Sequence, residues 1–253
     1  MLHSFLLIGQ SNAAGRGFLT DAAPLDTRGG RIKVLRNGRW VDAFRPINPD
    51  RPFSGICLAE RFATLYADAH PDCEVGIIPC ADGGTQIAQW LPGEVLFENA
   101  VHCAQLAMRS SRLTGILWHQ GEGDCGEERY LVYEARFRAV MDGIRDALGC
   151  PSLPVMIGGL GDFLAHFEAP LHPISQGYGR VNEVLRRLGR QYPNAAFVSA
   201  EGLGGNPDNL HFSADALNTL GARYYEAFLR FSATDEAPLP PSNAEKMTAL
   251  ELL

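Results

Sequence analysis

The hydrophobic residues of this chain gather in short runs that are separated by longer segments of mixed polarity. Five runs rich in β-branched or aromatic residues have the length of a strand: residues 5–8, 75–78, 115–118, 155–157 and 196–198. Polar residues hardly alternate with apolar ones inside these runs, which is typical of strands buried on both faces. The pattern therefore predicts about five parallel strands at the centre of the fold.

Between and after these runs, apolar residues recur at helical spacing. The series are Tyr130, Tyr133, Phe137, Val140, Ile144 and Leu148; Tyr178, Val181, Leu185, Leu188 and Tyr192; and Leu217, Leu220, Tyr224, Phe228 and Phe231. Ser213 is the predicted N-cap of the last helix. Because helices supply the crossovers between parallel strands, the expected fold class is α/β, a three-layer α/β/α sandwich.

Residues 1–231 are predicted to form one domain. Two segments of the chain lack the alternation of strand-like and helix-like patterns. Residues 15–54 are rich in Gly, Arg, Asp and Pro, and we interpret them as an ordered insertion. Asn37-Gly38 predicts a small hairpin within it, across residues 32–34 and 40–41. Residues 232–253 form a Pro-rich C-terminal tail.

Charge and composition exclude several classes of partner. The chain has 22 Lys and Arg against 29 Asp and Glu, a net charge of −7, so no nucleic-acid partner is expected. Its apolar runs are far shorter than the roughly 18 residues of a membrane span, so no membrane partner is expected either. No signal peptide is visible and the six cysteines lack a C-x-x-C pair, which favours a cytoplasmic protein unless a leader has been removed.

Ligands of open parallel sheets bind beyond the carboxyl ends of the strands, where four polar motifs of this chain fall. These motifs are Gly-Gln-Ser-Asn at 9–12, Ala-Asp-Gly-Gly-Thr-Gln at 81–86, His-Gln-Gly-Glu-Gly-Asp at 119–124 and Asp-Asn-Leu-His at 208–211. Ser11 follows a predicted strand, where a serine is either a nucleophile or simply the N-cap of the next helix. Asp208 and His211 can share a hydrogen bond that presents Nε2 as a base, although a satisfied surface histidine is the alternative.

Other chemistries find little support in the sequence. Residues 158–161 lack the spacing of a dinucleotide fingerprint and no Gly-Lys-Ser/Thr loop occurs, so no cofactor is expected. His119, Glu122 and Asp124 are not accompanied by a metal-ligand pattern, so no metal site is expected. The G-x-S-x-G elbow of standard α/β-hydrolases is also absent.

Taken in order, the four motifs resemble the conserved blocks of the SGNH hydrolase superfamily, and most closely its branch of carbohydrate esterase family six and sialate O-acetylesterases. The resemblance runs from Phe5 to about Phe231. It is carried by G-Q-S-N at 9–12, G-G-T at 83–85 with Trp90 after it, W-H-Q-G-E at 118–122 and D-x-x-H at 208–211. It implies the SGNH or flavodoxin-like form of the α/β/α sandwich.

The resemblance also implies roles for individual residues. Ser11 would be the nucleophile, His211 the general base and Asp208 the acid that orients it, with Glu122 as an alternative acid. The implied oxyanion donors are the N–H groups of Ser11 and Gly84 and the side-chain amide of Gln120. Since losing one such donor costs about 10²–10³ in kcat, Gln120→Ala is expected to cripple turnover with the fold intact. The residues expected to contact the substrate are Gln10, Asn12, Thr85 and Trp90.

The expected function is that of a serine esterase that removes O-acetyl groups from carbohydrates, either acetylxylan-like or sialate-like. Its partner would be an acetylated sugar or another small ester, and the aromatic candidates for stacking on it are Phe18, Trp40, Phe53 and Trp90, each of which could instead belong to the core. One alternative is a short-chain lipid or thioester esterase of the same fold. Another is a catalytically inactive glycan-binding domain.

Overall fold

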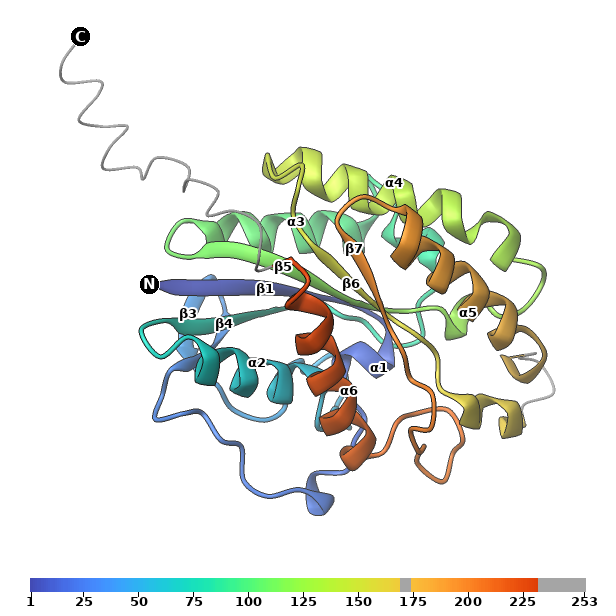
Figure 1. Cartoon of the computed structure of the whole chain (residues 1–253), viewed down its shortest axis with the longest axis horizontal. Helices are drawn as coiled ribbons and strands as arrows, with labels where there is room; N and C mark the ends of the chain where they lie inside the picture. Colours follow the sequence, from blue (N-terminus) through green and yellow to red (C-terminus); the bar gives the residue numbers. More distant parts are fainter. Residues whose placement is uncertain (169–173, 232–253) are drawn as a thin grey trace, which may run out of the picture.

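A computed structural model describes residues 1–168 and 174–231 and has a central sheet between two layers of helices (Figure 1). Within these residues the sheet has seven strands in the order β3-β2-β4-β1-β5-β6-β7. The strands are β1 (Leu2–Gly9), β2 (Ile32–Arg36), β3 (Arg39–Asp42), β4 (Glu74–Pro79), β5 (Arg112–His119), β6 (Val155–Gly158) and β7 (Ala195–Val198). Neighbouring strands are parallel except for the antiparallel pair β2 and β3. The predicted α/β class and its five strands are confirmed.

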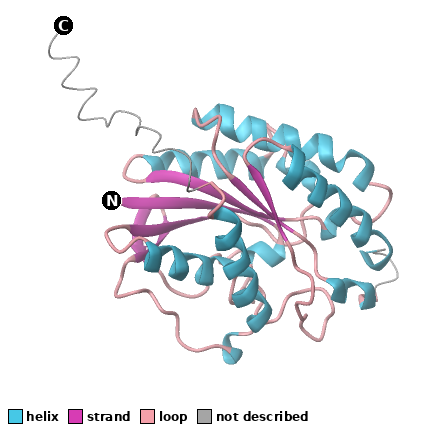
Figure 2. Ribbon diagram, viewed as in Figure 1, coloured by secondary structure: helices cyan, strands magenta, loops and turns pink. Residues whose placement is uncertain are grey.

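Helices cover both faces of the sheet (Figure 2). The longer ones are α2 (Leu58–Ala69), α3 (Val95–Met108), α4 (Tyr130–Leu148), α5 (Ile174–Gln191) and α6 (Ala214–Phe228). The shorter ones are α1 (Ser11–Ala14) and the 3-10 turns η1 (Leu19–Asp21), η2 (Ile87–Trp90), η3 (Glu122–Asp124) and η4 (Asp162–His166). Helices α3, α4 and α5 pack on one face, and α2 and α6 on the other. Ser213 caps α6 as predicted, because its side chain accepts a hydrogen bond from the N–H of Ala216.

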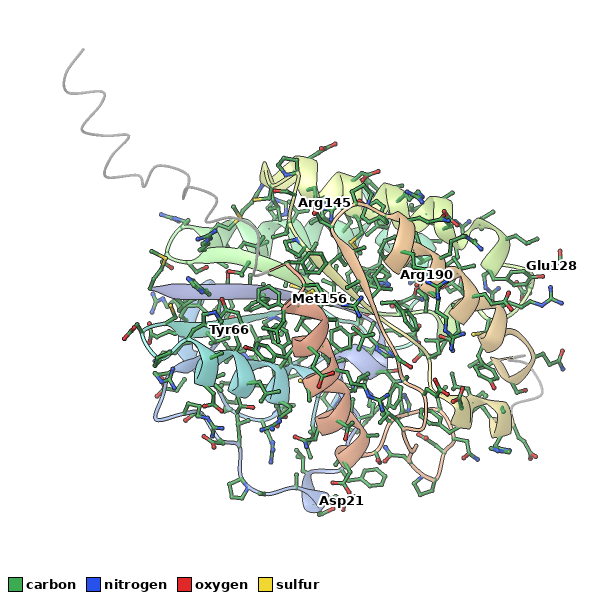
Figure 3. All side chains as sticks on the ribbon, in the orientation of Figure 1. Asp21, Tyr66, Glu128, Arg145, Met156 and Arg190 are labelled. Carbon is green, nitrogen blue, oxygen red and sulfur yellow. The ribbon has the colours of Figure 1, made fainter. Side chains whose placement is uncertain are left out.

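Strand β1 shows why the strands carry no polar alternation. Its side chains Leu6 and Ile8 pack against the layer of α3, α4 and α5, while Phe5 and Leu7 pack against the layer of α2 and α6. All four are completely buried. Side chains fill the space on both sides of the sheet (Figure 3).

The segment interpreted as an insertion contributes to the sheet. Its hairpin forms β2 and β3, and β2 pairs in parallel with β4, with Ile32 opposite Val75. The sheet is therefore wider than the five predicted strands, because the hairpin extends one edge. The tail at 232–253 lies outside the described residues. None of the helices in the described ranges is long and apolar enough to cross a membrane.

The strand order brings three of the four motifs together. Strand β1 lies between β4 and β5, so the segments that follow these three strands meet at one edge. The N–H of Gln10 donates to the carbonyl oxygen of His119 at 2.9 Å, and the N–H of Asp82 donates to Gly9 at 3.0 Å. Gly9 has φ +127°, and a Cβ there would lie 2.1 Å from the carbonyl oxygen of His119. Only glycine permits this close approach.

Candidate active site

Ser11, His211 and Asp208 form one line of hydrogen bonds. The Oγ of Ser11 lies 3.0 Å from Nε2 of His211, and Nδ1 of His211 lies 2.7 Å from Oδ2 of Asp208. Ser11 is the first residue of α1, whose N-cap is Gln10. The capping alternative for Ser11 is therefore wrong, and its hydroxyl instead faces the imidazole across the end of the sheet.

Asp208 is held as a charged group. Its Oδ1 accepts hydrogen bonds from the N–H groups of Leu210 at 2.9 Å and His211 at 3.0 Å. Partial burial raises the pKa of Asp208, but the hydrogen bonds from the His211 ring and these two N–H groups outweigh it and leave the pKa below its usual value. An ionised Asp208 fixes the Nδ1 proton of His211 and leaves Nε2 free to accept a proton.

Glu122, the alternative acid, does not contact His211. Its Oε1 accepts a hydrogen bond from Nδ2 of Asn12 and lies 3.9 Å from Nε2 of His119. The side chain is buried, which raises the pKa of Glu122 to about 7, and Oε2 has no partner within the described ranges. The acid that touches the histidine is thus Asp208.

Asn12 ties the loop of His211 to the turn of Ser11. Its Nδ2 donates to the carbonyl oxygen of Leu210 at 3.1 Å, and its Oδ1 accepts from the N–H of Phe212 at 3.1 Å. One side chain, next to Ser11 in the sequence, therefore holds the backbone on both sides of His211. Asn12 is only 1% exposed, so the expectation that it contacts the substrate is wrong.

Gln10 holds the loop after β5 in place through hydrogen bonds. Its Oε1 accepts from Nε2 of Gln120 at 3.1 Å and from the N–H groups of Gly121 at 3.3 Å and Gly123 at 3.1 Å. Gln10 is 4% exposed. Its Oε1 supports the site from inside, and contact of Gln10 with the substrate stays a prediction.

Gln120 is completely buried and its amide is fully engaged. Its Nε2 has two hydrogens and three acceptors around it, because the carbonyl oxygen of Thr85 at 3.1 Å and Oδ2 of Asp124 at 2.7 Å lie there in addition to Oε1 of Gln10. Its Oε1 accepts from the hydroxyl of Tyr133 at 2.8 Å. No donor of Gln120 remains for an oxyanion near Ser11, so that expectation is corrected: Gln120→Ala should first cost stability, because it leaves buried polar groups unpaired.

The two expected backbone donors are free. No hydrogen-bond acceptor for the N–H of Ser11 or of Gly84 lies among residues 1–168 and 174–231. Gly84 has φ +79° and open space beside it. A Cβ on Gly83 would lie 3.4 Å from Cβ of Ser11, so the glycine loop packs directly against the serine.

Thr85 and Trp90 belong to the interior. The hydroxyl of Thr85 donates to the carbonyl oxygen of Asp82 at 2.8 Å and accepts from Nε1 of Trp90 at 3.2 Å. Trp90 is fully buried and packs edge to face on Trp118. Substrate contact is therefore excluded for both side chains, and the tryptophan is a core residue.

A groove of about 460 Å³ opens beside the triad. We call it the His211 groove, and its defining residues are Phe18, Leu19, Pro52, Phe53, Asp208 and His211. The four apolar residues come from the insertion at 15–54, and Phe18 and Phe53 are two of the stacking candidates predicted from the sequence. The exposed rings of Phe18 and Phe53 remain candidates for stacking, whereas Trp40 packs against the core.

The site residues supply acids and bases but no metal-binding cluster. Within the described part of the chain, no group of three or more His, Cys, Asp or Glu side chains could hold a metal ion.

Comparison with known proteins gives a family and a fold. The family model described as carbohydrate esterase, sialic acid-specific acetylesterase matches residues 1–230. A probable carbohydrate esterase of Arabidopsis thaliana is 26% identical over 249 residues, which cover 89% of each protein. The crystal structure of this plant protein superposes with a TM-score of 0.77 at 27% identity, over 90% of this chain and 98% of that one.

More distant structures share the fold. The crystal structure of NanS gives a TM-score of 0.69 at 18% identity, over 92% of this chain and 98% of that one. A carbohydrate acetylesterase from Xanthomonas citri gives 0.67 at 18% identity, over 88% of this chain and 55% of that one. These likenesses place the sheet and its helices in the SGNH-type hydrolase fold.

Proposed function

The chain belongs to the carbohydrate esterase family of sialic acid-specific acetylesterases, and we propose that it removes O-acetyl groups from sugars through an acetyl-enzyme on Ser11. Membership makes it a carboxylic ester hydrolase. The observation that carries the proposal is the line of hydrogen bonds from Ser11 through His211 to Asp208, with distances of 3.0 and 2.7 Å. This is the arrangement that a serine nucleophile requires.

In the acylation step, Nε2 of His211 removes the hydroxyl proton of Ser11 while Oγ forms a bond to the carbonyl carbon of the acetyl ester. Asp208 stabilises the imidazolium without taking its proton. His211 then gives this proton to the sugar oxygen as the carbon–oxygen bond of the ester breaks, which leaves the acetyl group on Ser11. A water molecule deprotonated by His211 attacks the acetyl-enzyme, and acetate leaves as Ser11 regains its proton.

The negative oxygen of each tetrahedral intermediate would be bound by the N–H groups of Ser11 and Gly84. Both N–H groups lack an internal acceptor among the described residues, which supports this role. Donors of this kind are worth about 10²–10³ in kcat each because they face the charge that develops in the transition state.

The test compares the wild type with Ser11→Ala on 4-nitrophenyl acetate and 4-nitrophenyl butyrate. We expect acetate turnover to fall at least about 10³-fold in the variant while its circular dichroism is unchanged. Equal and slow rates for both proteins would refute the nucleophile and favour a glycan-binding domain without catalysis.

One observation favours a second candidate, a short-chain lipid or thioester esterase. The His211 groove has apolar walls that could receive an acyl chain. The same assay separates the two functions: a higher kcat/KM for butyrate than for acetate would assign the groove to the acyl group, whereas a preference for acetate assigns it to the alcohol.

A further inference from the structure

The walls of the His211 groove include exposed aromatic rings. Phe53 is 69% exposed and Phe18 is 49% exposed, and both line the groove. In the described part of the chain only one other phenylalanine, Phe44, is comparably exposed, and it does not line the groove. Exposed aromatic rings next to catalytic groups mark a binding surface for a ligand with an apolar face.

Phe53 is also held in place. The Cζ of Arg16 lies 5.2 Å from the centre of the Phe53 ring, a cation–π contact that supports the ring. A ring fixed in this way presents a surface for stacking at little entropic cost.

The groove offers no free positive charge. Among its described lining residues, Arg16 is the one arginine or lysine. Its guanidinium forms two hydrogen bonds to Asp50, at 3.0 and 2.7 Å, and the two side chains are only 5% and 4% exposed. A third bond goes to the carbonyl oxygen of Gly15, and Nε is buried. The charge of Arg16 is therefore neutralised within the protein.

The groove instead carries negative charge. Asp208 lines it with a side chain that is 47% exposed and ionised. Arg51, on the same loop as Phe53, does not line the groove and is paired with Asp82 at 2.7 Å, with 39% and 31% of the two side chains exposed. A carboxylate on the substrate would find no unpaired arginine or lysine among the described lining residues of the groove and would be repelled by Asp208 and by the net charge of −7.

We propose that the His211 groove binds the sugar part of the substrate, with Phe18 and Phe53 against its C–H face, and selects uncharged O-acetylated pyranoses over sugars that carry a carboxylate. The proposal rests on the proposed function and narrows its substrate class. A volume of about 460 Å³ lies within the range of about 300–1,000 Å³ for small-molecule sites and far exceeds the need of an acetyl group.

The test measures acetate release from four substrates by the full chain. Ethyl acetate measures ester hydrolysis in the absence of a sugar. An O-acetylated methyl xylopyranoside is the neutral sugar substrate. The charged pair consists of 9-O-acetyl-N-acetylneuraminic acid and its 1-carboxamide, which differ only in the carboxylate. We expect kcat/KM to be at least about tenfold higher for the carboxamide than for the acid, with a smaller ratio at high salt, because salt screens the repulsion.

Phe53→Ala and Phe18→Ala are the matched variants, and Phe44→Ala is the control. Loss of either groove ring should lower kcat/KM on the xylopyranoside about 3- to 10-fold, mainly through KM, and lower kcat/KM on ethyl acetate by a much smaller factor. Phe44→Ala should change neither. Thr20→Lys, which adds a cation at an exposed lining residue, should raise kcat/KM for the acid and leave the carboxamide unchanged.

Equal kcat/KM for acid and carboxamide in the wild type would overturn the selection against charge. Unchanged xylopyranoside kinetics in both phenylalanine variants would overturn the role of the groove. Absence of any Ser11-dependent hydrolysis, of ethyl acetate included, would overturn the proposed function itself, and this outcome is distinct from the other two.

Discussion

Two carboxylates lie near the Ser11–His211 pair in opposite surroundings. Asp208 is half exposed, receives hydrogen bonds from the imidazole and two N–H groups, and has a pKa below its usual value. Glu122 is buried, receives one hydrogen bond from Asn12, and has a pKa raised to about 7. A carboxylate is therefore not the acid of the triad merely because it lies near the catalytic pair. It must also receive enough hydrogen bonds to stay charged, as Asp208 does.

The neighbours of Glu122 explain why its charge is not stabilised. The hydroxyl of Tyr224 donates to the carbonyl oxygen of Trp118 at 2.7 Å, so it can only accept from Nδ1 of His119, 3.1 Å away. The Nε2 of this histidine then has no proton to offer Glu122. Burial lowers the pKa of His119 to about 3, which keeps the ring neutral.

The largest effect is expected from Asp208→Asn. An amide cannot stabilise the imidazolium or hold His211 in the correct tautomer, so kcat on 4-nitrophenyl acetate should fall about 10³–10⁴-fold. Steady-state kinetics at pH 7.5 measure this, with thermal unfolding as the control for folding. A loss below tenfold, paired with a large loss in Glu122→Gln, would reverse the two roles.

An intermediate effect is expected from Asn12→Ala. Releasing the backbone on both sides of His211 should lower kcat about 10²-fold with little change in KM, since a displacement of about 1 Å is enough. Asn182→Ala is the matched control, because buried Asn182 makes the same pair of bonds to the N–H and carbonyl of Leu160. Equal kcat losses in the two variants would show that general destabilisation explains the result.

The smallest effect on activity is expected from Glu122→Gln, which keeps an oxygen for Asn12 but cannot ionise. Its kcat should stay within about tenfold of the wild type, because the side chain does not touch His211.

The free energy of unfolding of Glu122→Gln should nevertheless depend on pH differently from that of the wild type. Unfolded Glu122 loses its proton near pH 4.5 and the folded form only near 7, so this group makes the wild type less stable as pH rises through that window. Between pH 5 and 8 the free energy of unfolding of Glu122→Gln should gain roughly 2–3 kcal/mol relative to the wild type. Urea denaturation at both pH values measures it, and parallel pH profiles would contradict the burial of an uncharged Glu122.

Most of the helices and strands could be predicted from the sequence, because the pattern of apolar residues that determines each element lies within that element. The unbroken apolar runs, such as residues 5–8, require burial on both faces, and the helical spacing of residues 130–148 reappears as α4. The pairing of the β2–β3 hairpin with β4 was missed, because the parallel contact between Ile32 and Val75 depends on residues far apart in the sequence.

The site was only partly predictable, because a polar motif does not reveal which way its side chains point. Gln10 has an extended backbone, where successive side chains face opposite sides, so its side chain turns away from that of Ser11. Asn12 is the second residue of α1, and its side chain turns inward to Glu122 and the loop of His211. Gln120 was misjudged for the same reason, since its partners Thr85, Asp124 and Tyr133 come from three separate segments. Phe18 and Phe53 lie in irregular loops, where no periodicity separates exposed from buried positions.

The most direct test of the account is the rate at which a fluorophosphonate modifies the protein, followed by intact mass and peptide mapping. The account predicts a single adduct on Ser11 in the wild type, formed at a similar rate in Glu122→Gln and at least about 10²-fold more slowly in Asp208→Asn. An adduct on another residue, or slow labelling in Glu122→Gln with normal labelling in Asp208→Asn, would contradict it.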